Sequence, residues 1–323
     1  MALAQPKTLL DHPSRALPWF RGLTLATAIC TFALVILGGV VRVTDSGLGC
    51  PDWPLCYGGL LPPLESKAII EFSHRVMASL LVGPLILVTV GMAWIFYRRV
   101  PWVVIPATVA LILLIVQALL GGSTVVNNLP GPVISAHLAV GEALLACLIL
   151  LTVVAFRGPL LITFSRIISG QKDWLPLLLL AATVSIYALL ISGSIVTTSG
   201  ATFACADWPL CQGEVFPQGL PAAIHMGHRY VALIVGMFLL YSVHLGFRAR
   251  YRSRDLRLLS MAVAALFVLQ IAVGAATILF GFPIHMVALH LALGSAVWAT
   301  IAAAAFASLT CPSSAEAVSQ GAT

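Results

Sequence analysis

The chain is dominated by long apolar stretches that are not interrupted by regularly alternating polar residues. A helix that crosses a bilayer needs about 20 mostly apolar residues, whereas a membrane-spanning strand alternates apolar and polar positions. Continuous runs of this length therefore predict transmembrane helices, and the chain contains eight of them. The predicted spans cover residues 20–42, 68–97, 101–122, 133–156, 174–196, 222–246, 257–280 and 284–308.

Composition strengthens this prediction and excludes a soluble protein. Of the 323 residues, 60% are hydrophobic and only 9% are charged, against about 25% charged residues in a typical soluble domain. Mean hydropathy is +1.04. The formal net charge of +6 does not indicate nucleic-acid binding, because most of the cations lie in the N-terminal tail and in the segments between spans, where they report topology. We expect membrane lipid to surround the protein, and no nucleic-acid partner.

The distribution of the cations predicts the orientation of the spans. Thirteen of the 17 lysines and arginines fall in the N-terminal tail, the turn after the second span, the linker after the fourth and the loop after the sixth. Because positively charged segments stay on the cytoplasmic side, we expect a multi-pass protein of the cell membrane with both termini cytoplasmic. The first span is then a signal anchor, since the 19 residues before it are too polar for a signal peptide. The four remaining cations, near the outer face, are Arg42, Lys67, Arg75 and Arg229.

An internal repeat divides the chain into two halves. The segment Cys50–Cys56 recurs as Cys205–Cys211, and four further anchors recur at nearly the same offset of 153 to 155 residues. Those anchors pair His74 with His228, Arg75 with Arg229, Gln117 with Gln270, and His137 with His290.

The repeat predicts an all-α polytopic membrane protein in which eight transmembrane helices form two parallel, pseudo-symmetric four-helix bundles. Four spans per unit is an even number, so both units enter the membrane from the same side and are related by an axis along the membrane normal. The expected parts are an N-terminal tail (1–19), a first half (20–156), a linker (157–173), a second half (174–308) and a C-terminal tail (309–323).

Four of the seven cysteines form two pairs in the long outer loops. Disulfides persist outside the cytoplasm, so we expect that Cys50 can pair with Cys56 and Cys205 with Cys211. Closing such a short loop contributes roughly 2–3 kcal/mol. We interpret the second pair as structural; for the first, a structural clip and an exchanging dithiol both stay open. A zinc site is poorly supported, because neither loop contains a histidine.

Four histidines lie in the first turns of the even-numbered spans, near the outer face, two in each half. Ionisable residues inside a membrane are costly and usually functional. A closed zinc site needs four ligands, whereas two imidazoles from separate helices suit the axial positions of a haem iron. The pattern predicts two haem sites, with His74 and His137 as iron ligands in one half and His228 and His290 in the other.

Two arginines follow histidines directly, at the outer rim of each predicted site. A guanidinium binds carboxylates in a bidentate manner, so Arg75 and Arg229 are candidate partners of the haem propionates. The alternative is that both side chains extend to the membrane interface.

One acidic residue distinguishes the two predicted sites. Glu71 lies three residues before His74, on the same helix face, and the equivalent position in the second half is His225. We predict that Glu71 is a proton acceptor or donor, the alternative being an interfacial ion pair with Arg75. Glu142, whose equivalent is Ser295, is a weaker candidate.

Taken together, the Glu71-Phe72-Ser73-His74-Arg75 motif, His137, His228-Arg229, His290 and the outer cysteine pairs resemble the haem A synthase family over residues 20–308. Members of this family oxidise the C8 methyl group of haem O to a formyl group, which gives haem A for cytochrome c oxidase.

The resemblance implies a role for each half. His74 and His137 would flank the substrate haem O, with Glu71 in catalysis, and His228 and His290 would be the axial ligands of a haem B cofactor. Cys50 and Cys56 would correspond to cysteines implicated in haem or electron transfer. Haem O synthase (protohaem farnesyltransferase), which supplies the substrate, is an expected partner, and a homo-oligomer is compatible with the sequence.

Two alternatives share part of this pattern. A quinol-linked dihaem b-type electron carrier would use the same histidines without needing Glu71. A parallel-repeat transporter would place polar residues at mid-membrane, where this chain has few besides Gln117 and Gln270.

Overall fold

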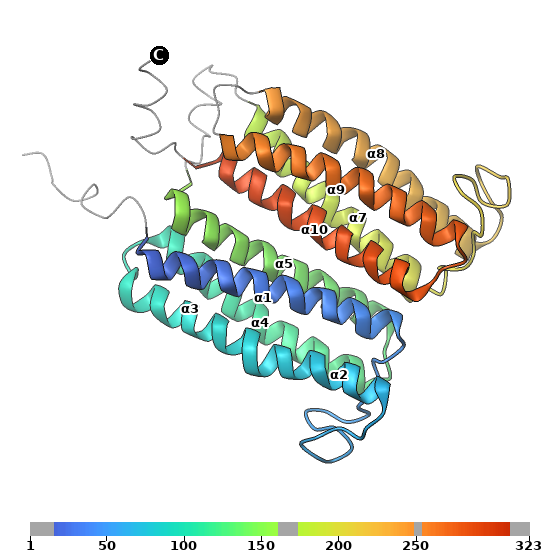
Figure 1. Cartoon of the computed structure of the whole chain (residues 1–323), viewed down its shortest axis with the longest axis horizontal. Helices are drawn as coiled ribbons and strands as arrows, with labels where there is room; N and C mark the ends of the chain where they lie inside the picture. The colour runs from blue at the N-terminus through green and yellow to red at the C-terminus, as the bar shows by residue number, and fades with distance from the viewer. Residues whose placement is uncertain (1–15, 161–173, 249–253, 311–323) are drawn as a thin grey trace, which may run out of the picture.

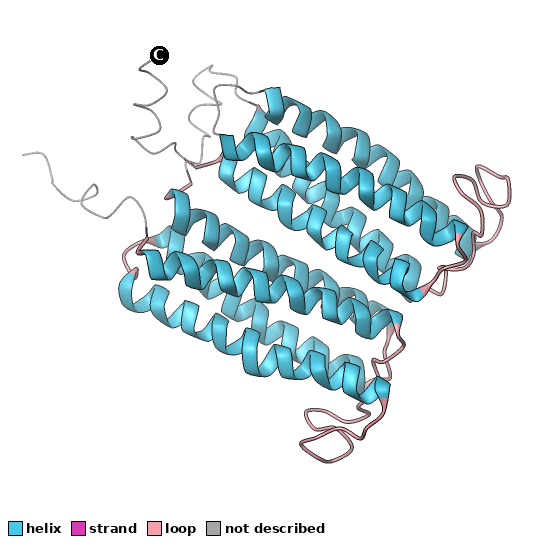
Figure 2. Cartoon of the chain, viewed as in Figure 1, coloured by secondary structure: helices cyan, strands magenta, loops and turns pink. Residues whose placement is uncertain are grey.

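The computed structural model describes residues 16–160, 174–248 and 254–310, and within them it contains eight helices long and apolar enough to cross a membrane (Figures 1 and 2). The prediction of eight helical spans is therefore confirmed. The helices are α1 (Pro18–Val43), the second span (Ser66–Phe96), α4 (Pro101–Val126), α5 (Gly131–Arg157), α7 (Leu175–Thr198), α8 (Leu220–Arg248), α9 (Arg254–Leu279) and α10 (Ile284–Ser308). Most of both predicted tails and of the 157–173 linker, with Lys7, Arg15, Arg166, Lys172, Arg250, Arg252 and Cys311, lies outside the described residues.

The second span is not uniform. It consists of α2 (Ser66–Val76), a π-helical segment η1 (Met77–Val82) and α3 (Gly83–Phe96). The change of pitch ends at Gly83-Pro84. Proline has no backbone N–H to continue an α-helical ladder, and π-helical turns are commonly inserted at such irregularities and near functional sites. His74 lies in α2, the segment just before the π-helical turn.

The helices lie in two groups, which Figure 1 shows side by side. One group holds α1, α2–α3, α4 and α5, with a core that includes Phe20, Ile86 and Leu151. The other holds α7 to α10, with a core that includes Phe267 and Ile301. The groups meet where α5 packs against α7 and α10, and where α1 packs against α10. That the groups are related by pseudo-symmetry stays a prediction.

The chain runs up and down through the bundle, so the two long loops (44–65 and 199–219) emerge at one end. The short turn that contains Arg98 and Arg99 lies at the opposite end, with the first residues of α1 (Figure 1). All four predicted iron ligands lie in the helical turns nearer the cysteine loops, because each belongs to the first half of a helix that starts at that end.

Candidate functional site

Each of the four histidines lies against a glycine of a neighbouring helix. A Cβ atom placed on Gly38 of α1 would lie 3.2 Å from His74 Nε2, and one on Gly121 of α4 would lie 3.1 Å from His137 Cε1. In the second group the corresponding contacts are 3.1 Å for Gly193 and His228 Cε1, and 2.7 Å for Gly274 and His290 Cε1. Real Cβ contacts under 3.0 Å essentially do not occur, and contacts of 3.0–3.4 Å are tighter than nine in ten of those observed. These glycines therefore make room for the imidazole rings.

Two glutamines contact the histidines of α5 and α10. Gln117 Nε2 lies 3.2 Å from His137 Nε2, and Gln270 Nε2 lies 3.3 Å from His290 Nε2. In each case the amide also lies beside a glycine one helical turn after the histidine, since a Cβ on Gly141 would come within 3.1 Å of Gln117 Nε2. The glutamine fixes the orientation of the imidazole ring.

The histidines keep ring nitrogens free for a ligand. The buried Nδ1 atoms of His137 and His290 have no hydrogen-bond partner among the described residues. His228 Nδ1 lies 2.8 Å from Ser192 Oγ, which leaves Nε2. A metal-bound histidine typically shares its other ring nitrogen with a protein group in this way. The described ranges contain no group of three or more His, Cys, Asp and Glu side chains that could hold a bare metal ion.

In the described part of the first half, helix packing leaves the helix that carries His74 without contact to the helix that carries His137. Within the described residues, α2 and η1 pack against α1 but not against α4 or α5. His74 of α2 and His137 of α5 are nevertheless within electrostatic reach of each other. A planar macrocycle ligated from both sides needs two histidines that face each other across helices not in contact. The residues present fit a haem held by two imidazoles.

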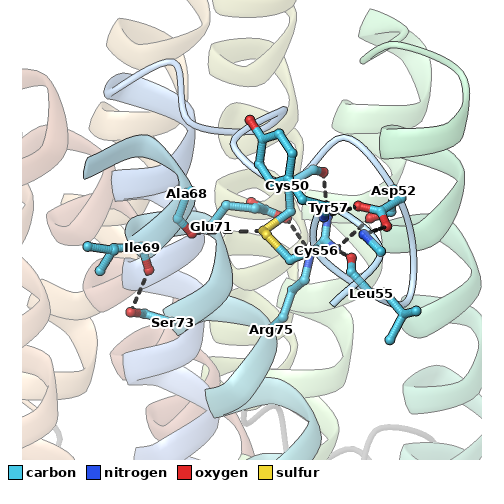
Figure 3. The surroundings of a disulfide bond; sticks show 11 residues. Cys50, Asp52, Leu55, Cys56, Tyr57, Ala68, Ile69, Glu71, Ser73 and Arg75 are labelled. Carbon is cyan, nitrogen blue, oxygen red and sulfur yellow. Dashed lines mark hydrogen bonds and ion pairs between the residues drawn. A yellow bond between two sulfur atoms is a disulfide. The ribbon is translucent and has the colours of Figure 1, made fainter. Parts of the chain in front are cut away.

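The acidic candidate is buried in the same helix as His74, three residues earlier. Glu71 is 6% exposed, and its Oε1 accepts a 2.9 Å hydrogen bond from Arg75 Nε. Both side chains face the first cysteine loop from the same helix (Figure 3). The sequence offered a proton-transfer group and an ion-pair partner as alternative readings of Glu71. The structure shows the ion pair, and a carboxylate in an ion pair still has lone pairs that accept a proton.

The two rim arginines make contacts that the sequence did not indicate. Arg75 donates from Nη1 to the carbonyl oxygens of Asp52 and Leu55, both at 2.7 Å, and from Nη2 to that of Cys50 at 3.0 Å. Arg229 donates in the same manner to the carbonyls of the second loop, among them Cys205 at 3.5 Å, and Asp207 and Leu210, both at 2.8 Å. Each guanidinium therefore holds a cysteine loop onto its helix. Contact with a propionate stays a prediction for both.

Both outer cysteine pairs form disulfides, Cys50 with Cys56 and Cys205 with Cys211. All four of these cysteines are buried, at 0% to 1% exposure. Backbone hydrogen bonds between Cys56 and Gly59, and between Cys211 and Glu214, close a turn directly after each ring. Cys30 and Cys147 are free and half-buried in the helices. The loops are therefore compact caps at one end of the bundle.

Other sequence candidates are placed away from an iron-binding position. His225 Nδ1 lies 3.1 Å from the Ala201 carbonyl, and its Nε2 lies 3.4 Å from Arg229 Nη2. Glu142 is 1% exposed, and its Oε1 accepts a hydrogen bond from Ser295 Oγ, so it lies between the two groups of helices. Neither residue joins a histidine pair.

Several residues around the site escaped the sequence analysis. The histidine-contacting glycines repeat at the same offsets as the histidines, 155 residues from Gly38 to Gly193 and 153 from Gly121 to Gly274. That recurrence is a signal that could have found them. Ser192 had no such signal, because its first-half equivalent is Leu37.

Comparison with known proteins identifies the family of this chain. The family model of the cytochrome oxidase assembly protein (COX15-CtaA) matches residues 21–302. A protein called heme A synthase from Alkalihalophilus pseudofirmus is 34% identical over 67% of this chain and 73% of its own length. Proteins of the same name are 31% identical in Exiguobacterium (80% of this chain, 82% of the relative) and 29% identical in Halalkalibacterium halodurans (85% and 92%). The chain belongs to the cytochrome oxidase assembly protein family.

Proposed function

We propose that this protein is a haem A synthase, an oxidoreductase that converts the C8 methyl group of haem O to a formyl group. The observation that carries the proposal is the unequal pair of sites. Two histidine pairs with matching glycine contacts are present, but the buried carboxylate Glu71, three residues before His74, has a histidine as its equivalent in the second half. The names of the relatives favour this function over a dihaem electron carrier. A carrier has no need of that carboxylate.

The first half is the proposed substrate site. His74 and His137 hold the iron of haem O, and the glycines at positions 38 and 121 admit the rings at their observed positions. Fixing the porphyrin from both faces restricts which methyl group reaches the reactive position, and such orientation contributes much of an enzyme's rate. Glu71 is the proposed acceptor for protons released when the methyl group is oxidised. Its bond to Arg75 holds the carboxylate in one direction.

The second half is the proposed cofactor site. His228 and His290 would hold the iron of haem B, and Ser192 and Gln270 orient the two imidazoles. When bound, haem B supplies redox chemistry that amino-acid side chains lack. The chain contributes the ligands, their orientation and exclusion of water. His225, where the first half has Glu71, bonds to the Ala201 carbonyl, so this site has no acid at the equivalent position.

The proposed setting follows from the charge distribution. Arg98 and Arg99 lie at the end of the bundle opposite the cysteine loops. Because cationic segments face the cytoplasm, both termini are cytoplasmic, and the histidine pairs and cysteine loops lie near the outer face of the cell membrane. Haem O synthase is the proposed partner that hands over the substrate, and self-association is compatible with this setting.

Extraction and mass analysis of the pigments in the purified protein test the proposal. We expect haem B together with haem O or haem A. Two equivalents of haem B alone would support the electron carrier instead, and a protein purified without haem from cells that make haem O would contradict both functions.

A further inference from the structure

We propose that Arg75 is a positioning residue that fixes the direction of the Glu71 carboxylate according to the state of the Cys50–Cys56 ring. The inference rests on the proposed function in taking Glu71 as the proton acceptor. Its geometry stands independently, because one guanidinium bonds to the carboxylate and to three carbonyls of the disulfide-closed ring.

The Arg75 guanidinium divides its donors between two different structures. Nε bonds to Glu71 Oε1, while Nη1 and Nη2 bond to the carbonyls of Cys50, Asp52 and Leu55, all within the ring (Figure 3). The arginine side chain is 14% exposed and that of Glu71 is 8% exposed. Because a guanidinium is planar and rigid, its donors turn together. A movement of the three carbonyls therefore changes the direction of the Nε–H bond that holds Glu71.

The ring holds its carbonyls together by covalent closure and by a local clamp. Asp52 accepts hydrogen bonds from Tyr57 N at 2.6 Å and Gly58 N at 2.7 Å, which fold the segment after the ring back onto it. Opening the disulfide removes the covalent closure and gives the loop more conformations. The three carbonyls then no longer form one fixed acceptor set for Arg75.

The same ring also contacts the helix that packs on the second histidine. A Cβ on Gly122 of α4 would lie 3.0 Å from the Trp53 ring, so the indole rests directly on this glycine. The preceding residue, Gly121, contacts His137. The first loop thus reaches from Arg75, next to His74, to the glycine pair beside His137. A change in the ring therefore alters contacts on both sides of the first site, at Arg75 and at Gly122.

The second half has the same clamp, but its arginine contacts a histidine in place of an acid, since Arg229 Nη2 lies 3.4 Å from His225 Nε2. Arg229 donates to the carbonyls of Cys205, Asp207 and Leu210, at the positions equivalent to those bound by Arg75. Its buried Nε, the atom that would hold a carboxylate, has no hydrogen-bond partner in the described residues. The position equivalent to Gly122 is Ala275. Clamping the loop is therefore common to both halves, whereas the link from the loop to an acid exists only in the first.

Infrared difference spectroscopy on reduction of the disulfide tests the proposal. The full-length protein carries Cys205→Ala and Cys211→Ala, so that Cys50–Cys56 is the disulfide that reacts. A water-soluble phosphine is the reductant. It takes the oxygen of one water to become a phosphine oxide, and its two electrons with the two protons of that water leave Cys50 and Cys56 as thiols.

We expect reduction to shift a carboxylate stretching band, and we expect Glu71→Gln to remove that band, which assigns it. Arg75→Gln abolishes the reduction-induced shift. Arg75→Lys keeps a cation but lacks the planar guanidinium with its fixed donors, so it abolishes the shift too. This variant tests the proposal if Arg75→Gln does not fold. Arg229→Lys, the matched control, leaves the shift in place.

Three results would overturn the proposal: no Glu71 band on reduction of the protein with Arg75 intact, a shift that persists in Arg75→Lys, or a shift that Arg229→Lys abolishes as well. The spectra do not depend on haem A formation. A protein that shows the shift but makes no haem A refutes the proposed function alone, and one that makes haem A without the shift refutes only the coupling.

Discussion

The two halves use the same parts around their histidines and differ in what lies beside them. Arg75 and Arg229 each hold a disulfide-closed loop through its backbone carbonyls. Only Arg75 also bonds to an acid, because Glu71 in the first half is replaced by His225 in the second. In the proposed function the repeated scaffold supplies two places for a macrocycle, and the exchange of Glu71 for His225 separates the proposed proton-transfer site from the proposed cofactor site.

A second kind of difference occurs where the halves touch. Ser295 donates to Glu142, its counterpart 153 residues earlier in the repeat. Arg42 donates from Nη2 to the carbonyl of Thr197, its counterpart at an offset of 155, at 3.1 Å. When equivalent positions of two copies meet, identical charges would face each other. The sequence avoids this by keeping the charge in one copy only, so these asymmetries reflect contact rather than catalysis.

The largest expected effect is the loss of activity when Glu71 is replaced. Glu71→Gln should lower the rate of haem A formation by about 10² to 10⁴-fold, the usual contribution of a general acid or base, while haem binding is retained. His225→Gln, the matched change, should leave the rate within about twofold, because it touches no proposed proton-transfer group. Single-turnover conversion of haem O in the purified variants measures both. Equal losses in the two variants would remove the distinction between the sites.

A second acid at the contact between the halves should lower the stability of the protein. Ser295→Glu places two carboxyl groups at a buried contact, because Glu142 is 1% and Ser295 is 4% exposed. An uncompensated buried charge costs about 3–5 kcal/mol, so the unfolding midpoint in a denaturing-detergent titration should fall. The exchange Glu142→Ser with Ser295→Glu restores one acid and one hydroxyl and should recover most of the loss. A stable Ser295→Glu variant would contradict this account of the interface.

The glycine contacts predict unequal sensitivity of the two halves. Gly274→Ala and Gly121→Ala each press a methyl group on an imidazole proposed to ligate iron, at 2.7 Å and 3.1 Å before relaxation. Overpacking typically costs about 1–3 kcal/mol, and we expect Gly274→Ala to lie at the upper end and Gly121→Ala at the lower. The amount of haem that each variant retains after size-exclusion chromatography measures the effect. Greater haem loss from Gly121→Ala would reverse the comparison.

The smallest effect concerns the first loop at low pH. Hydrogen bonds from the backbone N–H groups of Gly58 and Tyr57 hold the pKa of Asp52 below its ordinary value, with that from Gly58 the larger cause. The stabilisation by Asp52 is therefore complete above the ordinary pKa of an aspartate and is lost as the pH falls through the lowered pKa.

Amide hydrogen exchange of Tyr57 and Gly58 measures this transition. The exchange rates are compared between about pH 6 and pH 2.5, after correction for intrinsic rates, because this interval covers the ordinary pKa of an aspartate and values below it. Protection should persist to below the ordinary pKa and then disappear. Asp52→Asn should show weaker protection that does not vary over the same range. Protection lost well above the ordinary aspartate pKa would contradict the assignment.

Much of the fold could be predicted from hydropathy, because a bilayer leaves a long apolar run few structures besides a helix. The π-helical turn at Met77–Val82 could not, since it depends on how Gly83-Pro84 is accommodated within an otherwise continuous span. The histidine positions could be predicted because two copies repeat them. Which side chains orient the rings depends on helix rotation, so Ser192 was not identified.

The rim arginines show where residue types alone are insufficient. A guanidinium beside a predicted haem site indicates a carboxylate partner, and the sequence proposed the propionates. In the structure, Arg75 and Arg229 bond to backbone carbonyls, which every residue possesses and which no sequence motif reveals. Glu142 was considered for chemistry because it lacks an acidic counterpart, yet that counterpart, Ser295, is its hydrogen-bond donor.

Pigment analysis of two matched double variants tests the central claim, that the halves hold different haems, most directly. His74→Ala with His137→Ala should lose haem O and haem A while haem B remains near one equivalent. His228→Ala with His290→Ala should lose haem B. If the first double variant loses haem B, or if both lose the same pigment in the same proportion, the assignment of substrate and cofactor to separate halves is wrong.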